Sequence, residues 1–208
     1  MRWWLLIAMV ACDRSPSPRA IDLANITVSG AKLRTDTVGD GEFSEQATFV
    51  LVDSDNNSDT DAYVTLGGDL SEPSGEVVGQ LKPMSLWIPA HQSRTFALVD
   101  TERKPKTSAA GARIVVKGAV IDTPPVAHVD NVRTVDDHGK LLAQGELVND
   151  ADRPGTVMVI ASFHDPKGTP LTRPFTMVHV EPKQRQWIEL VGPPGGTTGM
   201  MFVGDVAY

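Results

Sequence analysis

The chain repeats itself at an offset of 93 residues, and this duplication restricts the possible folds more than any single motif does. The matches fall at turns and at alternate positions of apolar runs, where a shared backbone constrains the residue type. They include Asn56 with Asn149, Asp59 with Asp152, Val64 with Val157, Leu70 with Phe163, and residues 72–75 with 165–168. One inserted residue near His91 then aligns Gln92 with Gln184. The sequence therefore predicts two similar structural units in tandem.

Each repeat consists of short alternating runs rather than helical ones. Pro, Gly or Asp interrupts nearly every stretch with apolar residues at helical spacing, and the chain is rich in Gly (18) and Pro (15). We expect an all-β fold of two immunoglobulin-like antiparallel β-sandwiches, at residues 21–122 and 126–208, separated by Thr123-Pro124-Pro125. The expected strand regions are 46–52, 61–66, 93–99, 112–121, 140–148, 155–163, 175–180, 185–191 and 200–208.

The N-terminus has the pattern of a secretory signal. Arg2 precedes an apolar run from Trp3 to Ala11, which ends at Cys12, the single cysteine of the chain. The run is too short to cross a bilayer, which needs about 20 residues. An ordinary signal peptide, or a buried strand with an incidental cysteine, would also fit. Residues 13–20, rich in Ser and Pro, resemble a flexible tether.

Met9-Val10-Ala11-Cys12 resembles the lipobox of bacterial lipoproteins, although Met9 departs from the more usual Leu. The resemblance implies cleavage after residue 11 and diacylation of Cys12, with residues 1–11 as signal peptide and 12–20 as tether. Two acyl chains anchor a protein stably, whereas one alone binds only marginally. We therefore expect a lipid-anchored protein of the cell envelope, facing the periplasm or the cell surface, on either the inner or the outer membrane.

The second repeat also resembles the FxLYD-type immunoglobulin-like domain of bacterial lipoproteins. The similarity lies in residues 145–149 (GELVN) and in Phe163-His164-Asp165 followed by Gly168, before a later proline. His164 replaces the usual Tyr, and Lys183 stands where Gly is common. The resemblance implies a binding or spacer module, with no catalytic residues to transfer.

Charge and motif content restrict the function further. The formal net charge is -7 and Lys and Arg form no basic run, so we expect no nucleic-acid partner. The motifs G-x-S-x-G, H-E-x-x-H and the P-loop do not occur, and the acidic pair Asp136-Asp137 is expected in a solvated turn. We expect a non-enzymatic protein without a cofactor, with an envelope protein as partner.

The segment DSDNNSDTD, residues 53–61, has the acidic rhythm of a calcium loop. Counted from Asp53, an EF-hand loop would need Gly at position 6 and Glu at position 12, where Ser58 and Val64 stand. The repeat retains only Asn56 and Asp59. A polar turn is therefore the preferred interpretation, and a weak calcium site on Asp53, Asp55 and Asp61 is the alternative.

Two further residue groups could bind a ligand. Met177 and His179 share a strand face near Met158, a soft ligand set that copper(I) accepts, although Met on a strand usually fills a core. Trp87 and Trp187 could form a carbohydrate or protein site if exposed, but we expect both to pack in the cores. A periplasmic ligand- or metal-binding protein, with calcium or copper as the ion, is thus the alternative to a binding, spacer or assembly role.

Overall fold

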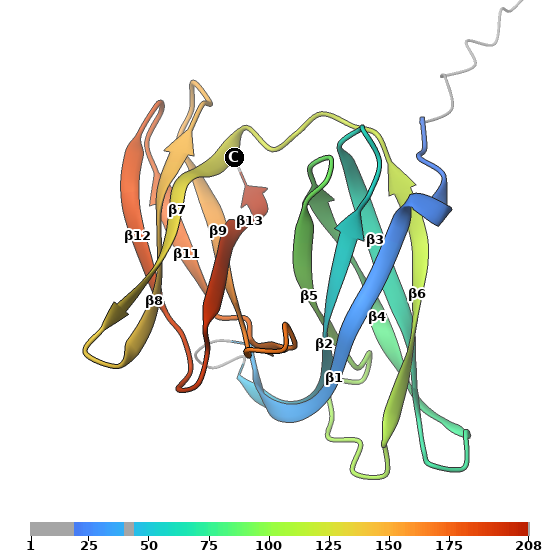
Figure 1. Cartoon of the computed structure of the whole chain (residues 1–208). Coiled ribbons are helices and arrows are strands. Elements are labelled where there is room, and N and C mark those ends of the chain that lie inside the picture. The colour runs from blue at the N-terminus through green and yellow to red at the C-terminus, as the bar shows by residue number, and fades with distance from the viewer. Residues whose placement is uncertain (1–18, 40–43, 208) are drawn as a thin grey trace, which may run out of the picture.

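The computed structural model describes residues 19–39 and 44–207, so Cys12 and the expected signal peptide lie outside the described residues. Within that part the chain is almost entirely β-strand, and every strand pairing is antiparallel (Figure 1). The helical segment described is the 3-10 turn η1 (Leu23–Asn25), and no helix in residues 19–39 and 44–207 is long and apolar enough to cross a membrane. The expected all-β fold is confirmed.

The first sandwich contains strands β1 to β6 in two sheets. One sheet has the order β1-β2-β5 and the other β4-β3-β6. The strands are β1 (Ile26–Val38), β2 (Glu45–Asn56), β3 (Ala62–Ser71), β4 (Val77–Ile88), β5 (Ser93–Val99) and β6 (Gly111–Val120). Alternate residues of β2 and β5, such as Val50, Val52 and Phe96, point between the sheets and form the core.

The second sandwich contains strands β7 to β13. One sheet has the order β12-β8-β7, and in the other β9 pairs with β10, β11 and β13. The strands are β7 (Ala127–Asp137), β8 (Lys140–Asn149), β9 (Gly155–His164), β10 (Pro170–Thr172), β11 (Phe175–Val180), β12 (Arg185–Val191) and β13 (Thr198–Ala207). Val157, Val159 and Phe163 of β9 lie in this second core.

The two sandwiches have the same topology, as the sequence repeat predicts. The sheet β1-β2-β5 corresponds to β7-β8-β12, and the central strand β3 corresponds to β9. In each sandwich the second strand pairs with the first and with the penultimate strand, while the third pairs with the last. These are the neighbour relations of strands A, B, E and C, F in immunoglobulin-like sandwiches.

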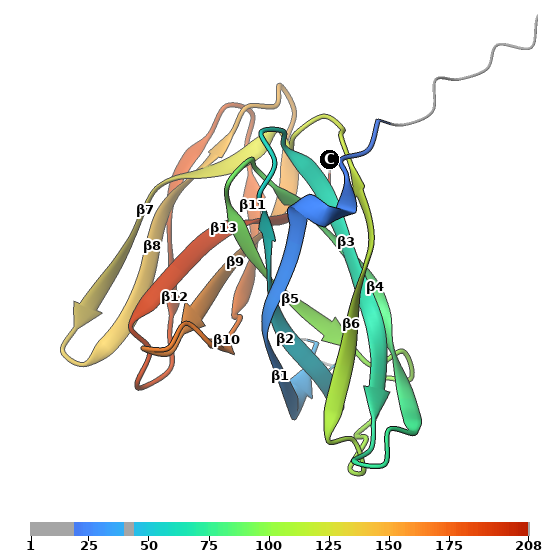
Figure 2. The ribbon, with the colours of Figure 1, turned by 45° about the vertical axis from the view of Figure 1, so that its right-hand side comes forward.

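The connection between the sandwiches runs through residues 121–126, which form no strand and cross over the top of the molecule in Figure 1. Residues 19 and 20, which the sequence analysis assigns to the tether, already pair with the first sandwich. Ala20 forms a β-bridge with Val120, and the Ile121 N–H donates to the Arg19 carbonyl at 2.8 Å. Figure 2 shows the two sandwiches side by side, with the β7–β8 hairpin directed away from the first.

Candidate functional site

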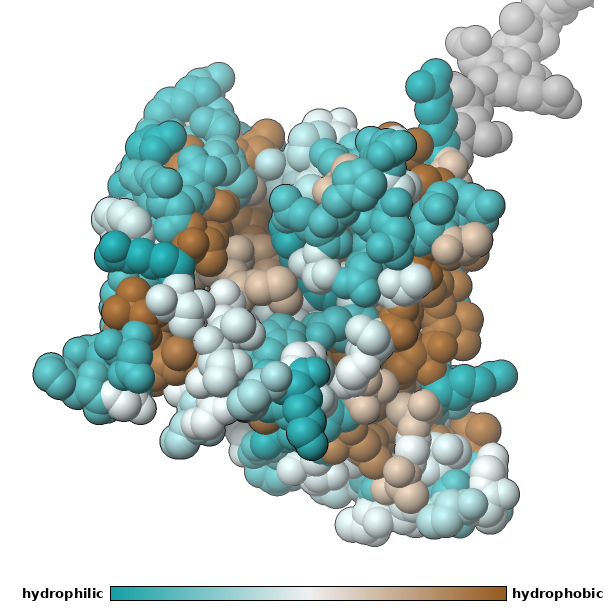
Figure 3. All heavy atoms as spheres, in the orientation of Figure 1, coloured by the Kyte–Doolittle hydropathy of each residue, from teal (hydrophilic) through white to brown (hydrophobic). Residues whose placement is uncertain are grey.

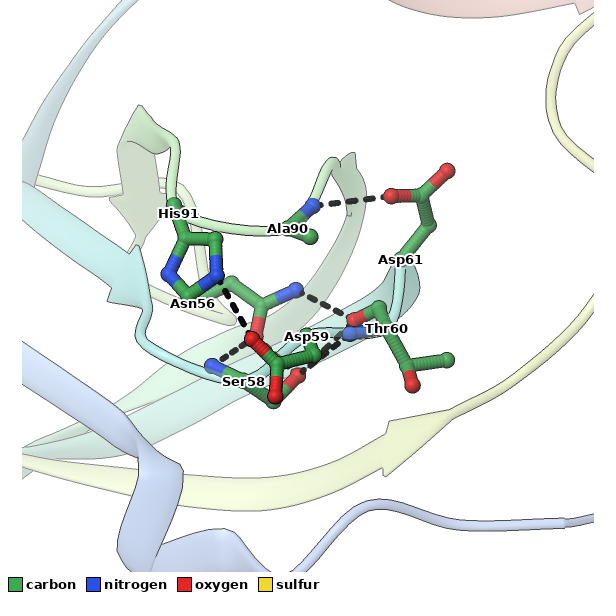
Figure 4. Close-up of polar contacts among 7 residues, drawn as sticks. All are labelled: Asn56, Ser58, Asp59, Thr60, Asp61, Ala90 and His91. Carbon is green, nitrogen blue, oxygen red and sulfur yellow. Dashed lines mark hydrogen bonds and ion pairs between the residues drawn. The ribbon is translucent and has the colours of Figure 1, made fainter.

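The acidic loop after β2 is organised by one buried amide. The side-chain nitrogen of Asn56 donates to the carbonyls of Thr60 (2.9 Å) and Ile88 (3.0 Å), and its oxygen accepts the Ser58 N–H at 3.1 Å. Figure 4 shows the contacts of Asn56 with Ser58 and Thr60 inside the loop. Asn suits this position because its amide carries both donors and an acceptor, so it can satisfy several backbone groups at once.

Asn149 repeats this arrangement in the second sandwich. Its side-chain nitrogen donates to the carbonyls of Arg153 (3.3 Å) and Glu181 (2.9 Å), and its oxygen accepts the Ala151 N–H at 3.1 Å. Both asparagines are fully buried. The turn role that the sequence repeat assigns to this pair is therefore confirmed.

The aspartates of the same segment do not converge on a common point. Asp55 accepts from Thr27 Oγ1 at 3.1 Å, whereas Asp61 Oδ1 accepts the Ala90 N–H at 2.8 Å and so ties the loop to the β4–β5 turn (Figure 4). Asp59 lies 2.9 Å from the exposed imidazole of His91. In the described residues no group of three or more acidic, His or Cys side chains is placed to hold a metal ion.

Asp53 has a different environment from the other aspartates. It lies on β2, it is only 8% exposed, and it faces the second sandwich. Its Oδ1 accepts from Thr95 Oγ1 at 2.5 Å, and its Oδ2 lies 2.9 Å from His164 Nε2, which is 6% exposed. This carboxylate is therefore a buried contact between the two sandwiches rather than part of an open calcium loop.

The methionines and histidine considered for copper are divided between two environments. Met177 lies directly opposite Met158 in the β11–β9 pairing, as expected from the sequence. His179 is exposed, and its Nε2 lies 3.5 Å from Glu181. Met158 packs against the core cluster of the first sandwich, and it lines the space between the sandwiches. This strand face therefore offers a single imidazole, that of His179, as a possible copper ligand. Of its two thioethers, that of Met158 packs against the first sandwich.

Trp87 and Trp187, the two tryptophans of the sandwiches, are not fully buried. Trp87 is half-buried and meets Tyr63 edge to face, with ring centroids 5.1 Å apart. Trp187 is 57% exposed on the outer face of β12, where the Arg133 guanidinium lies 5.4 Å from its ring centroid. The prediction of core packing is wrong for Trp187, because the core-facing residue of this strand is its neighbour Ile188. Sequence alternation alone leaves open which of the two neighbours points inward.

Two arginines contribute further polar contacts between the sandwiches. Arg34 Nη1 of β1 donates to the Leu171 carbonyl, and Arg173 Nε donates to the Thr95 carbonyl at 2.7 Å. Both contacts involve the β10–β11 segment, which reaches across from the second sandwich to the first. Together with Asp53 and His164, these residues form what we call the polar seam: Arg34, Asp53, Thr95, His164, Leu171 and Arg173.

An aromatic ring from the second sandwich completes the contact. Phe202 of β13 is buried in the core cluster of the first sandwich, together with Ile160 of β9. The guanidinium carbons of Arg94 and Arg173 lie 5.0 and 6.0 Å from the centre of the Phe202 ring. Burial lowers the pKa of both Arg94 and Arg173 to about 10, because desolvation disfavours their charged forms.

A cleft of about 570 Å³ lies between the sandwiches beside the polar seam. One wall is the outer face of β2 and β5, and the other comes from β9 and the β10–β11 segment. Its lining is mainly apolar and includes Phe49, Leu51, Ala97, Val99, Met158 and Phe175, together with Arg34, Asp36 and Arg173. The hollow between the two lobes at the top of Figure 3 is a different depression, because this cleft lies toward the opposite end of the sandwiches, where β1 and β5 end. Clefts of this size at domain contacts are common ligand sites.

Comparison with known proteins finds weak structural similarities. No protein-family model and no curated protein matches the sequence. Among solved structures, red sea bream transglutaminase matches with 15% identity over 82% of this chain and a TM-score of 0.25, and this chain covers 28% of that enzyme chain. The tandem CBM22 domains of Paenibacillus barcinonensis Xyn10C match with 9% identity, coverages of 93% and 91%, and a TM-score of 0.16.

Proposed function

We propose that this protein is a lipid-anchored, non-catalytic binding or assembly module of the bacterial cell envelope, attached to the membrane through Cys12. The observation that carries the binding role is the polar seam with its adjoining cleft. Two sandwiches that served only as a flexible spacer would not need a buried Asp53–His164 contact between them. Because buried polar groups require matched partners, such a contact favours one relative orientation of the sandwiches and thereby maintains a defined binding surface.

The lipid anchor is supported by the lone cysteine directly after the apolar run, and it can be tested by its processing. We expect Cys12→Ala, or globomycin treatment of cells making the unaltered protein, to leave the unprocessed precursor. Ser15→Ala, three residues further on in the tether, is the matched control and should be processed normally. Normal maturation and membrane recovery of the Cys12→Ala protein would contradict the proposed anchor.

The assembly role is tested by cross-linking in intact membranes, followed by recovery of the full-length protein. We expect a defined partner to be captured, and we expect less capture when His164→Ala opens the polar seam. The surface variant His91→Ala removes an imidazole that is also 2.9 Å from a carboxylate but is exposed, so it serves as the control. Recovery of no stable partner from wild-type membranes would contradict the assembly role.

A further inference from the structure

The cationic side of the cleft lacks a matching anion within the described residues. Arg173 uses its Nε for the Thr95 carbonyl, and Arg34 uses one Nη for the Leu171 carbonyl. Neither guanidinium lies within 4.0 Å of a described carboxylate. Asp36, the acidic residue in the cleft lining, is exposed and accepts the N–H of the adjacent Thr37. Each arginine therefore retains N–H groups that could bind an anion.

The partial burial of Arg173 favours binding of an anion beside it. The guanidinium stacks only loosely on Phe202, and burial lowers its pKa to about 10. A buried cation is normally paired with an anion, because removal from water is costly without one. An anionic group beside Arg173 and Arg34 would form charge-assisted hydrogen bonds in a partly dry site, where such bonds are strongest.

The rest of the cleft lining is mainly apolar, and part of it is exposed to solvent. Phe49, Ala97 and Val99 lie on the outer face of β2 and β5, and Phe175 and Val191 remain 40% and 56% exposed on the opposite wall. An exposed apolar surface inside a cleft at a domain contact is typical of a ligand site. The cleft thus combines a cationic end with a long apolar wall, which matches the two ends of an amphipathic anion.

We propose that the cleft binds an amphipathic anion of the fatty-acid class, with its carboxylate or phosphate head at Arg173 and Arg34 and its tail along Phe49, Ala97, Val99 and Phe175. This inference specifies the ligand class for the proposed binding role. It does not depend on Cys12, because none of the residues that form the cleft belongs to the N-terminal segment.

The probe for this proposal is a palmitic-acid analogue that carries a diazirine in its chain, applied to membranes that contain the full-length protein. After irradiation and proteolysis, we expect adducts to concentrate in peptides from β2, β5 and β11. A phosphate-headed analogue with the same chain tests the second anionic head group. A trimethylammonium-headed analogue is the control for partitioning, and it should label these peptides weakly. Equal labelling by cationic and anionic probes would overturn the proposal.

Two variants test the two ends of the cleft. Arg173→Met keeps the aliphatic stem but removes the charge, and it should raise the half-saturating probe concentration about tenfold, as for loss of a hydrogen bond to a charged group. Its control is Arg113→Met on β6, which removes an exposed arginine that lies 2.8 Å from Asp69 of β3. Ala97→Phe fills the apolar wall and should abolish labelling without removing any charge.

The remaining outcomes also decide the proposal. Labelling that is unchanged in Arg173→Met and Ala97→Phe, or spread over the whole surface, would overturn it. Protection of the cleft peptides by a cross-linked protein, without labelling, would show that a protein occupies the cleft and would overturn the amphiphile. The mass of the mature N-terminus in the same samples reports on Cys12 separately, so failure of the lipid anchor and failure of the cleft ligand are distinguishable.

Discussion

Asn56 and Asn149 each donate to two backbone carbonyls and accept one backbone N–H within a loop. Replacement by Ala removes these three hydrogen bonds, and losses of this kind cost about 1–3 kcal/mol. We expect Asn56→Ala and Asn149→Ala each to lower the free energy of unfolding by about this amount in urea titrations. The control is Asn57→Ala, which removes an exposed contact to Thr27 and should have little effect. Equal losses in all three variants would contradict this account.

Asp165 shows how a turn residue makes stability depend on pH. Its Oδ1 accepts the N–H groups of Thr169 (2.9 Å) and Lys167 (2.8 Å), and the bond from Thr169 is the main cause that lowers the Asp165 pKa below its ordinary value of 3.8. Because the folded pKa is lower than the unfolded one, the carboxylate stabilises the fold above the unfolded pKa. That contribution is lost as the pH falls through the folded pKa.

The measurement compares the wild-type protein with Asp165→Asn across this pH range. We expect the difference in the free energy of unfolding between them to shrink as the pH falls from about 5 to about 2. Asp122→Asn is a suitable control, because among the described residues Asp122 accepts the N–H of its neighbour Thr123 alone. A constant difference between wild type and Asp165→Asn would show that this carboxylate does not contribute through its charge.

The residues with local roles could be predicted from the sequence, whereas those with distant partners could not. Asn149 and the turn of residues 165–168 bond backbone groups two to four positions away, and the repeat displays them twice, although Asn149 also reaches the distant Glu181 carbonyl. His164 meets Asp53, which lies in the other repeat. In the FxLYD-type pattern that the second repeat resembles, His164 stands where Tyr is usual, but this difference does not indicate its partner.

At the level of strands, the sequence predicts the central strands better than the edge strands. β2, β3, β8 and β9 alternate clearly because both of their neighbours are strands and one face lies in the core. Of the edge strands, β1, β4, β7 and the short β10 lie outside the expected strand regions, whereas β5, β6, β11, β12 and β13 overlap them. β1 and β7 have mostly exposed positions, and β4 contains Pro83 at a register shift against β3. Edge strands tolerate polar residues and Pro, which weakens the alternating pattern.

The pairing of β3 with β6 gives a prediction for these elements. A Cβ added at Gly68 of β3 would lie 2.1 Å from the Arg113 carbonyl oxygen of β6, and backbone atoms cannot move aside easily. We expect Gly68→Ala to lower the free energy of unfolding by about 1–3 kcal/mol, as overpacking does in other cores. Gly118→Ala on β6 has open space around the added carbon and is the matched control. Similar midpoints of chemical unfolding for both variants would exclude this clash.

At the scale of the molecule, the same sheet face has different surroundings in the two sandwiches. The outer face of β2 and β5 is covered by the second sandwich, whereas the corresponding face of β8 and β12 is exposed. The residues differ accordingly: the 93-residue offset, with its one-residue correction, aligns Leu51 with Gln144, Asp53 with Glu146, Thr95 with Trp187 and Ala97 with Glu189. The duplication was visible in the sequence. The docking of the two sandwiches was not, because it depends on which of two similar faces is covered.

The polar seam can be tested against a surface pair of the same geometry. Asp53–His164 and Asp59–His91 each bring a carboxylate oxygen within 2.9 Å of an imidazole Nε2, but only the first pair is buried between the sandwiches. Double-mutant cycles with Ala at these positions measure each coupling in chemical unfolding. We expect about 0.5–3 kcal/mol for the buried pair and a value near zero for the exposed pair, where solvent screens the charges.

The same variants should change how the two sandwiches hold together. His164→Ala should accelerate proteolysis within residues 121–126 and should enlarge the radius of gyration in solution scattering, because the second sandwich would lose a buried contact to the first. His91→Ala should leave both measurements unchanged. The cleft is formed by both sandwiches. We therefore expect His164→Ala to be labelled less by the anionic probe if it is also less compact. A compact His164→Ala protein with unaltered proteolysis would show that apolar packing around Phe202 suffices to hold the sandwiches together.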